Sequence, residues 1–139
     1  MTIREAQDNF MEELNLFDSW QDKFNLLIEK GNFQPVELPE DLYEHRVGYC
    51  QSRTHFKAEN EGGCIQISGW SNSSIMAGLI VCVKQMFDCM PVDELAVAVV
   101  DFHTHSGLMD HVTPLRNAAI HEIVRRILVL CPAGKERDI

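Results

Sequence analysis

Apolar residues near the N-terminus recur every three or four positions, which is the spacing of one buried face of an α-helix. Thr2 and Glu5 form the capping box Thr-x-x-Glu, in which the two side chains satisfy free amides at a helix start. The pattern therefore predicts a first helix that begins at Thr2 and ends before residues 15–17. Its apolar positions are Ile3, Ala6, Phe10, Met11 and Leu14.

A second helix is predicted from Asp18. Gly31 should end it, because glycine readily adopts the left-handed conformation that is common at helix ends. Residues 32–49 contain two prolines and several acids, so they predict a surface connection with at most one helical turn near Glu40–Tyr43. The apolar face of the second helix consists of Trp20, Phe24, Leu27 and Ile28.

The middle of the chain changes to the two-residue period of a β-strand. Between Thr54 and Glu59 small or apolar residues alternate with polar ones, as in a half-buried strand. Asn60-Glu61-Gly62-Gly63 favours a hairpin loop, and Ile65 and Ile67 then share one face of a second strand. An antiparallel hairpin is predicted here, with Trp70 as the candidate start of a third pairing.

Helical spacing returns after the hairpin. Residues 71–74 offer several N-caps, and the apolar stripe that follows is wide enough to predict a central buried helix. Shorter helices are expected at 92–98 and at 101–106. Thr113 and Pro114 suit the cap and first turn of a last helix, and the polar tail after Pro132 should fray. The last helix has Ile120, Ile123, Val124, Ile127 and Leu128 on one face.

Together these elements predict one α+β domain over residues 1–139, in which a small antiparallel sheet of about three strands packs against helices from both ends of the chain. A chain of 139 residues buries roughly two-thirds of its unfolded surface.

Charge and composition narrow the function classes. The net charge is −9, which argues against nucleic acid as a partner because phosphate backbones are bound by clustered Lys and Arg. No apolar run reaches the roughly 18 residues of a membrane span, and the first residues lack the apolar core of a signal peptide. A cytoplasmic protein is expected. Its five cysteines form no Cys-x-x-Cys motif, so free thiols are the simplest interpretation.

Cys50 is the best candidate for a reactive thiol. It follows a turn-prone segment and has His45, Arg46 and Arg53 within five residues. Nearby cations lower the pKa of a thiol and favour the reactive thiolate. An inert cysteine in a loop is the competing interpretation. Among the others, Cys82 lies in the stripe of a buried helix, where apolar packing raises a thiol pKa.

The histidines suggest a metal site only superficially. Asp101-x-His103-x-His105 is followed by Asp110-His111, but the segment predicts short helices, on which His103 and His105 point about 200° apart. A partner acid with groups to orient it is not evident. Fortuitous surface histidines are the favoured interpretation, and no metal ligand is predicted.

Several short motifs follow one another from Thr2 to about Ile127. They are Leu16-Phe17-Asp18-x-Trp20, Arg46-Val47-x-x-Cys50-Gln51-Ser52, Ser74-Ile75-x-x-Gly78-Leu79-Ile80, Pro91-x-x-Glu94-Leu95, Gly107-Leu108 and Thr113-Pro114-x-Arg116. In this order the chain resembles the SufE family of sulfur-acceptor proteins, which work beside cysteine desulfurases in iron–sulfur cluster assembly. The second motif matches the segment that bears the acceptor cysteine of that family.

The chain also departs from the family pattern. Tyr49 stands where the family usually has glycine directly before the cysteine, with Gly48 one residue earlier. Thr54-His55 replaces a Val-Trp pair, and Ala118-Ala119 replaces an Asn-Gly or Gln-Gly pair. These differences indicate a divergent member.

The resemblance implies that Cys50 takes persulfide sulfur from a desulfurase and passes it to a cluster-assembly scaffold, stimulating the desulfurase. The protein would be a sulfur-transfer accessory with no cofactor of its own, because pyridoxal phosphate belongs to the partner desulfurase. Arg116 is a candidate for supporting the loop or the docking surface. Tyr49, Gln51 and Ser52 are candidates for shaping the turn.

Two other functions stay open at this point. One is an iron–sulfur or zinc-binding scaffold similar to the IscU family, and the other is an interaction module without sulfur transfer. A monomer or a weak homodimer is compatible with each of these functions.

Overall fold

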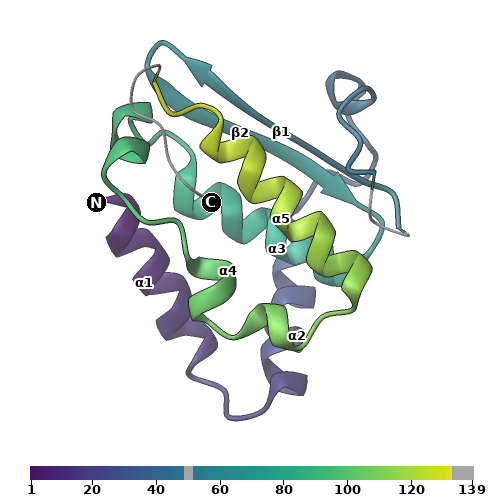
Figure 1. Cartoon of the computed structure of the whole chain (residues 1–139). Helices are drawn as coiled ribbons and strands as arrows, with labels where there is room; N and C mark the ends of the chain where they lie inside the picture. The colour runs from purple at the N-terminus through teal and green to yellow at the C-terminus, as the bar shows by residue number, and fades with distance from the viewer. Residues whose placement is uncertain (49–51, 133–139) are drawn as a thin grey trace.

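The computed structural model describes residues 1–48 and 52–132, and the α+β class predicted from the sequence is confirmed. Figure 1 shows helices gathered against one two-stranded hairpin. The helices are α1 (Ile3–Leu14), α2 (Trp20–Lys30), α3 (Ser74–Phe87), α4 (Phe102–His105) and α5 (Pro114–Leu128), and the strands are β1 (Thr54–Glu61) and β2 (Cys64–Ser71). Short 3₁₀ turns occupy Gly31–Phe33, Glu40–Leu42, Val92–Ala96 and Leu108–Asp110.

The N-terminal helices form largely as predicted. Thr2 caps α1, and the capping box with Glu5 is complete. The cap of α2 is Ser19, so this helix begins two residues later than the predicted Asp18. Lys23 of α2 is buried and donates to the carbonyl oxygen of Leu14, the last residue of α1, and to that of Phe17 in the turn that follows. Sequence periodicity missed this buried lysine, which ties the two helices together.

Gly31 ends α2, but the expectation of a left-handed conformation there is wrong. Its φ of −60° and ψ of −20° are right-handed helical values. Glycine is needed for space, because a Cβ at this position would lie 3.0 Å from the carbonyl oxygen of Ser74 and 3.1 Å from the amide nitrogen of Gly78. The connection after α2 therefore packs directly on the backbone of α3.

The sheet has two strands in the described residues, fewer than the predicted number of about three. β1 and β2 are antiparallel, and Gly62 and Gly63 form a two-residue turn with φ of 62° and 90°. Trp70 starts no third pairing, because it lies within β2 opposite His55. Two isolated bridges, Arg46 with His55 and Cys64 with Pro91, lie outside the two strands.

The central position of α3 is confirmed. In Figure 1 α5 runs across the hairpin with α3 behind it, and α1 lies to one side. The residues of β1 and β2 that face this layer include Phe56, Ile65 and Ile67, all almost fully buried. Of the five buried positions predicted for the last helix, Ile120, Ile123, Val124 and Ile127 are at most 1% exposed and Leu128 is 9% exposed.

The segment before α4 is held to α1 by Gln7, which is fully buried. Its amide donates to the carbonyl of Val99 at 2.8 Å and accepts from the amides of Asp101 and Phe102 at 2.8 and 2.9 Å. Every polar atom of the Gln7 side chain is thereby engaged, which is what permits a buried amide. In the part of the chain that the structure describes, no helix has the length and apolar content needed to cross a membrane.

Candidate functional site

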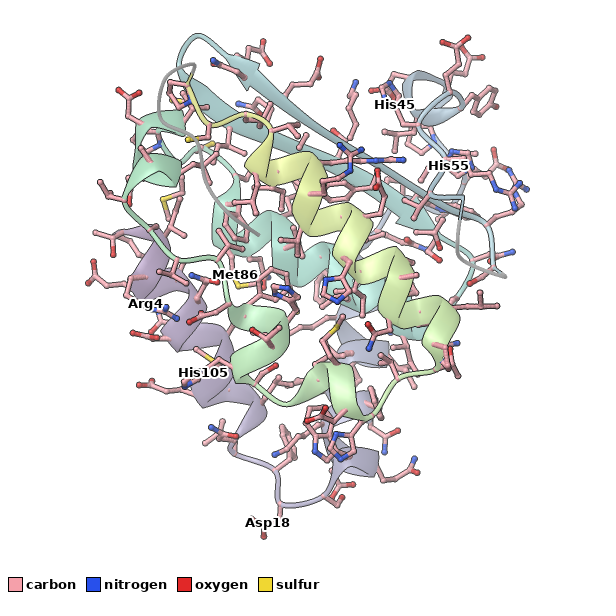
Figure 2. All side chains as sticks on the ribbon, viewed as in Figure 1. Arg4, Asp18, His45, His55, Met86 and His105 are labelled. Atoms are coloured by element: carbon pink, nitrogen blue, oxygen red, sulfur yellow. The ribbon has the colours of Figure 1, made fainter. Side chains whose placement is uncertain are left out.

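Tyr49, Cys50 and Gln51 lie outside the described residues, so the site is built from the chain on either side of them. The two sides meet in a short hydrogen-bonded stem. The Val47 amide donates to the carbonyl of Thr54 at 2.8 Å, and the Phe56 amide donates to the carbonyl of His45 at 2.9 Å. Figure 2 labels His45 and His55, one from each side of this stem. We call residues 48–52 the cysteine segment. The backbone positions on either side of it are held next to each other by these hydrogen bonds.

The stem continues into the open end of the hairpin. The Arg53 amide donates to Asn72 Oδ1 at 2.9 Å, and the Asn72 amide donates to the carbonyl of Arg53 at 3.0 Å. Thr54 Oγ1 and Ser71 Oγ are hydrogen-bonded at 2.9 Å in the buried layer beneath. These contacts place the end of the cysteine segment beside the N-terminus of α3.

Thr54 and His55, which stand where the SufE family usually has a Val-Trp pair, are both buried. Thr54 bonds Ser71, and His55 Nδ1 is 2.7 Å from the carbonyl oxygen of Leu42. Burying polar groups costs little free energy when each has a hydrogen-bond partner. At these two positions, side chains with hydrogen-bond partners therefore replace the apolar side chains that are usual in the family.

Residues 34 and 35 contact the end of β2 next to the stem. The Gln34 side chain bonds both the amide and the carbonyl of Ser71, and Trp70 Nε1 donates to the carbonyl of Pro35 at 3.0 Å. Phe33 and Val36 are left 82% and 96% exposed. Two large apolar side chains therefore stand on the surface close to the cysteine segment.

Arg126 reaches the stem from α5. Its Nη1 donates to the carbonyl oxygens of His45 at 3.0 Å and Phe56 at 2.7 Å, and its Nη2 donates to that of Arg46 at 2.9 Å. Both sides of the stem are thus bound by one side chain from a helix some 70 residues later in the sequence.

Three other arginines surround the site. Arg46 and Arg53 flank the cysteine segment and are exposed, and Arg53 lies over the Trp70 ring at 5.7 Å from its centroid. Arg116, half-buried, donates to Ser73 Oγ at 3.4 Å, next to Asn72. Among the described residues these three form no ion pair, whereas Arg4, Lys30, Lys57, Lys84, Arg125 and Arg126 each do. In a chain of net charge −9, three arginines with no carboxylate partner among the described residues therefore lie around the site.

The other cysteines are placed differently. Cys82 is 1% exposed, and burial raises the pKa of its thiol to about 12. The prediction that Cys82 is packing is confirmed. Cys64 and Cys131 are half-buried, and Cys89 is exposed with a φ of 66°.

The histidines are separated by the fold. His105 and His111 are exposed, and His105 lies far from His45 and His55 in Figure 2. The expectation that His103 is a surface residue is wrong, because it is 5% exposed and burial lowers its pKa to about 4. Within residues 1–48 and 52–132 no three His, Cys, Asp or Glu side chains come close enough to hold a metal ion.

Comparison with known families matches residues 8–130 to the SufE model, described as an Fe-S metabolism associated domain. The chain belongs to the SufE family. Membership gives it a role in iron–sulfur metabolism. It is similar to an uncharacterized SufE-like protein of Rhizobium meliloti (strain 1021), with 27% identity over 86% of this chain and 90% of the relative. A SufE-like protein of Rhizobium etli is 26% identical over 86% of this chain and 85% of its own length.

The SufE fold is also found in a solved structure. The solution structure of a hypothetical protein from Thermus thermophilus matches with a TM-score of 0.63 at 17% identity. The match covers 94% of this chain and 98% of the other. At this identity the likeness concerns the fold alone.

Sequence reasoning on this SufE chain missed Asn72 and Arg126. The sequence pattern indicates Asn72 only as one of several helix-cap candidates and gives no sign of Arg126. Neither shares a local pattern with Cys50, since their contacts with the stem arise from the hairpin register and from the position of α5.

Proposed function

We propose that this SufE protein accepts persulfide sulfur on Cys50 from a pyridoxal-phosphate cysteine desulfurase and passes it to an iron–sulfur scaffold. One observation carries the proposal: the family match runs through Arg46-Val47-x-x-Cys50-Gln51-Ser52. The described stem supports it, because a reacting thiol gains from a segment whose two ends are held in place.

The transfer is thiol exchange at a persulfide. The Cys50 thiolate, its proton released to solvent, attacks the terminal sulfur of the desulfurase persulfide. A sulfur–sulfur bond forms on Cys50 while that of the desulfurase breaks, and the desulfurase cysteine leaves as a thiolate that takes up a proton. No external oxidant or reductant is needed. The same exchange with a scaffold thiolate would move the sulfur onward.

Positive charge around the segment supports this chemistry. Arg46 and Arg53 adjoin the segment, and Arg116 lies at its base beside Ser73. Cations near a cysteine favour the thiolate over the thiol, and the same field favours a persulfide anion after transfer. The exposed Phe33 and Val36 would add apolar contact area for a docked desulfurase with an acidic rim. We place the reaction in the reducing cytoplasm, where free thiols persist.

The decisive experiment is sulfur loading. Reduced protein is incubated with a cysteine desulfurase and L-cysteine and weighed intact and as peptides, beside Cys50→Ser. A gain of one sulfur atom on the Cys50 peptide, absent in the variant, is expected. No gain, or a gain on another cysteine, would overturn the proposal. Desulfurase binding without sulfur uptake would instead support an interaction module, and iron or zinc in the purified protein would support a scaffold.

A further inference from the structure

The contact between Arg126 and the stem is more elaborate than helix packing requires. One guanidinium donates to three backbone carbonyls, those of His45 and Arg46 on one side of the stem and that of Phe56 on the other. Its Nε donates to Glu122 Oε2 at 2.8 Å, one turn earlier on α5. Hydrogen bonds from a charged donor are stronger than neutral ones. The guanidinium thus joins both sides of the stem to each other and to α5.

Glu122 keeps the guanidinium in this orientation. It accepts from Arg125 Nε at 2.8 Å and Nη2 at 2.7 Å as well as from Arg126. The hydrogen bonds from Arg125 and then Arg126 lower the pKa of Glu122 to about 2, so the carboxylate is ionised at neutral pH. One carboxylate is therefore shared by two arginines.

We propose that Arg126 is a positioning residue for sulfur transfer, held in place by Glu122, and that it determines where the Cys50 segment is presented to the desulfurase. This inference rests on the proposed function. Arg126 touches no reacting atom. Its contacts fix residues 45, 46 and 56, which lie on either side of Cys50 in the sequence.

Arg125 provides a matched control on the same helix. It shares Glu122 with Arg126 and carries the same charge, but its side chain is 52% exposed and its ion pair is with Glu122. Arg125→Gln and Arg126→Gln therefore remove one cation each, while only the second breaks the bonds to the His45, Arg46 and Phe56 carbonyls. Arg126→Lys keeps the charge but lacks the fork that reaches carbonyls on both sides.

The test measures sulfur uptake by Cys50 from a cysteine desulfurase at varied acceptor concentration, at a temperature where circular dichroism shows each variant folded. Arg126→Gln should lower kcat about tenfold with a smaller change in KM, as misplacement of a reacting group does. Arg126→Lys should recover part of the loss. Arg125→Gln should stay within about twofold of wild type, because it leaves the positioning contacts intact.

Two further readouts separate positioning from a general structural role. Hydrogen exchange at the Val47 and Phe56 amides should quicken in Arg126→Gln and not in Arg125→Gln. Alkylation of Cys50 by iodoacetamide needs no docking and should not slow in either variant. Wild-type kcat in folded Arg126→Gln, or an equal loss in Arg125→Gln, would overturn the inference. Absence of sulfur uptake by the wild-type protein would overturn the proposed function itself, and this role with it.

Discussion

Arg53 and Asn72 are paired twice across the open end of the hairpin, since the Arg53 amide donates to Asn72 Oδ1 at 2.9 Å and the Asn72 amide donates back to the Arg53 carbonyl at 3.0 Å. The pair extends the β1–β2 ladder by one step, directly after the cysteine segment. It also adjoins Ser73, the cap of α3. Asn72 therefore helps to fix the position of Arg53, the residue between the cysteine segment and β1.

Asn72→Ala should destabilise the protein by about 1 kcal/mol, because the Arg53 amide loses its acceptor. Asn72→Asp keeps an oxygen at the same place and should be close to neutral. Urea denaturation followed by circular dichroism measures both. Equal stability of the alanine variant and wild type would show that solvent replaces the side-chain bond without loss.

Gly78→Ala should destabilise the protein by about 3 kcal/mol or more, as overpacking of a tight contact does. A Cβ at Gly78 would overlap the carbonyl group of Leu27, where α2 crosses α3. Gly48→Ala is the matched control, because nothing lies within 4 Å of a Cβ there. Thermal unfolding compares the two variants. A melting temperature of Gly78→Ala near that of wild type would contradict the close helix contact.

Stability should fall with acidification below pH 6.5 through His103. Burial, and then the charge of His121, lower the pKa of His103 from 6.5 to about 4. The unfolded chain therefore binds the proton more readily between these values, and folding stability is lost as the pH falls from 6.5 to 4. The shift corresponds to at most about 3 kcal/mol. Urea titrations at pH 7 and pH 4.5 should show a smaller difference for His103→Leu than for wild type.

Removing the positive charges next to the cysteine segment should weaken desulfurase docking. Arg46→Gln combined with Arg53→Gln is expected to raise KM for the acceptor several-fold at low salt, and the difference should shrink as salt screens the charges. Lys84→Gln is a control, since that lysine is paired with Asp88 away from the site. A salt-independent effect would point to altered loop structure and away from electrostatic docking.

Cys82 should be the slowest of the described thiols to react with iodoacetamide at pH 8, and Cys89 the fastest. The first is 1% exposed with its thiol pKa raised to about 12, and the second is exposed. Peptide mass spectrometry over time gives the order. Cys82→Ala should keep sulfur uptake on Cys50 in folded protein. Early labelling of Cys82 would reveal opening of the contact between α1 and α3.

Local sequence patterns predict the four long helices, three of their caps and the hairpin. Thr2, Ser73 and Thr113 each cap a helix, and the turn after Glu61 is made by two glycines with positive φ. These features depend on residues within one helical turn or one hairpin of each other. Ordered motifs over the whole length also led to the family.

Which distant groups meet depends on how the helices and the hairpin pack together. Local conformation predicts a glycine at position 31 as a helix end. Glycine is required there because a Cβ would lie 3.0 Å from the carbonyl oxygen of Ser74 in α3. His103 was placed on the surface because a four-residue helix carries too little periodicity to show its buried side. The contact of Arg126 with the His45, Arg46 and Phe56 carbonyls depends on where α5 crosses the sheet. Every residue type carries a backbone carbonyl, so no pattern in the sequence predicts such a bond.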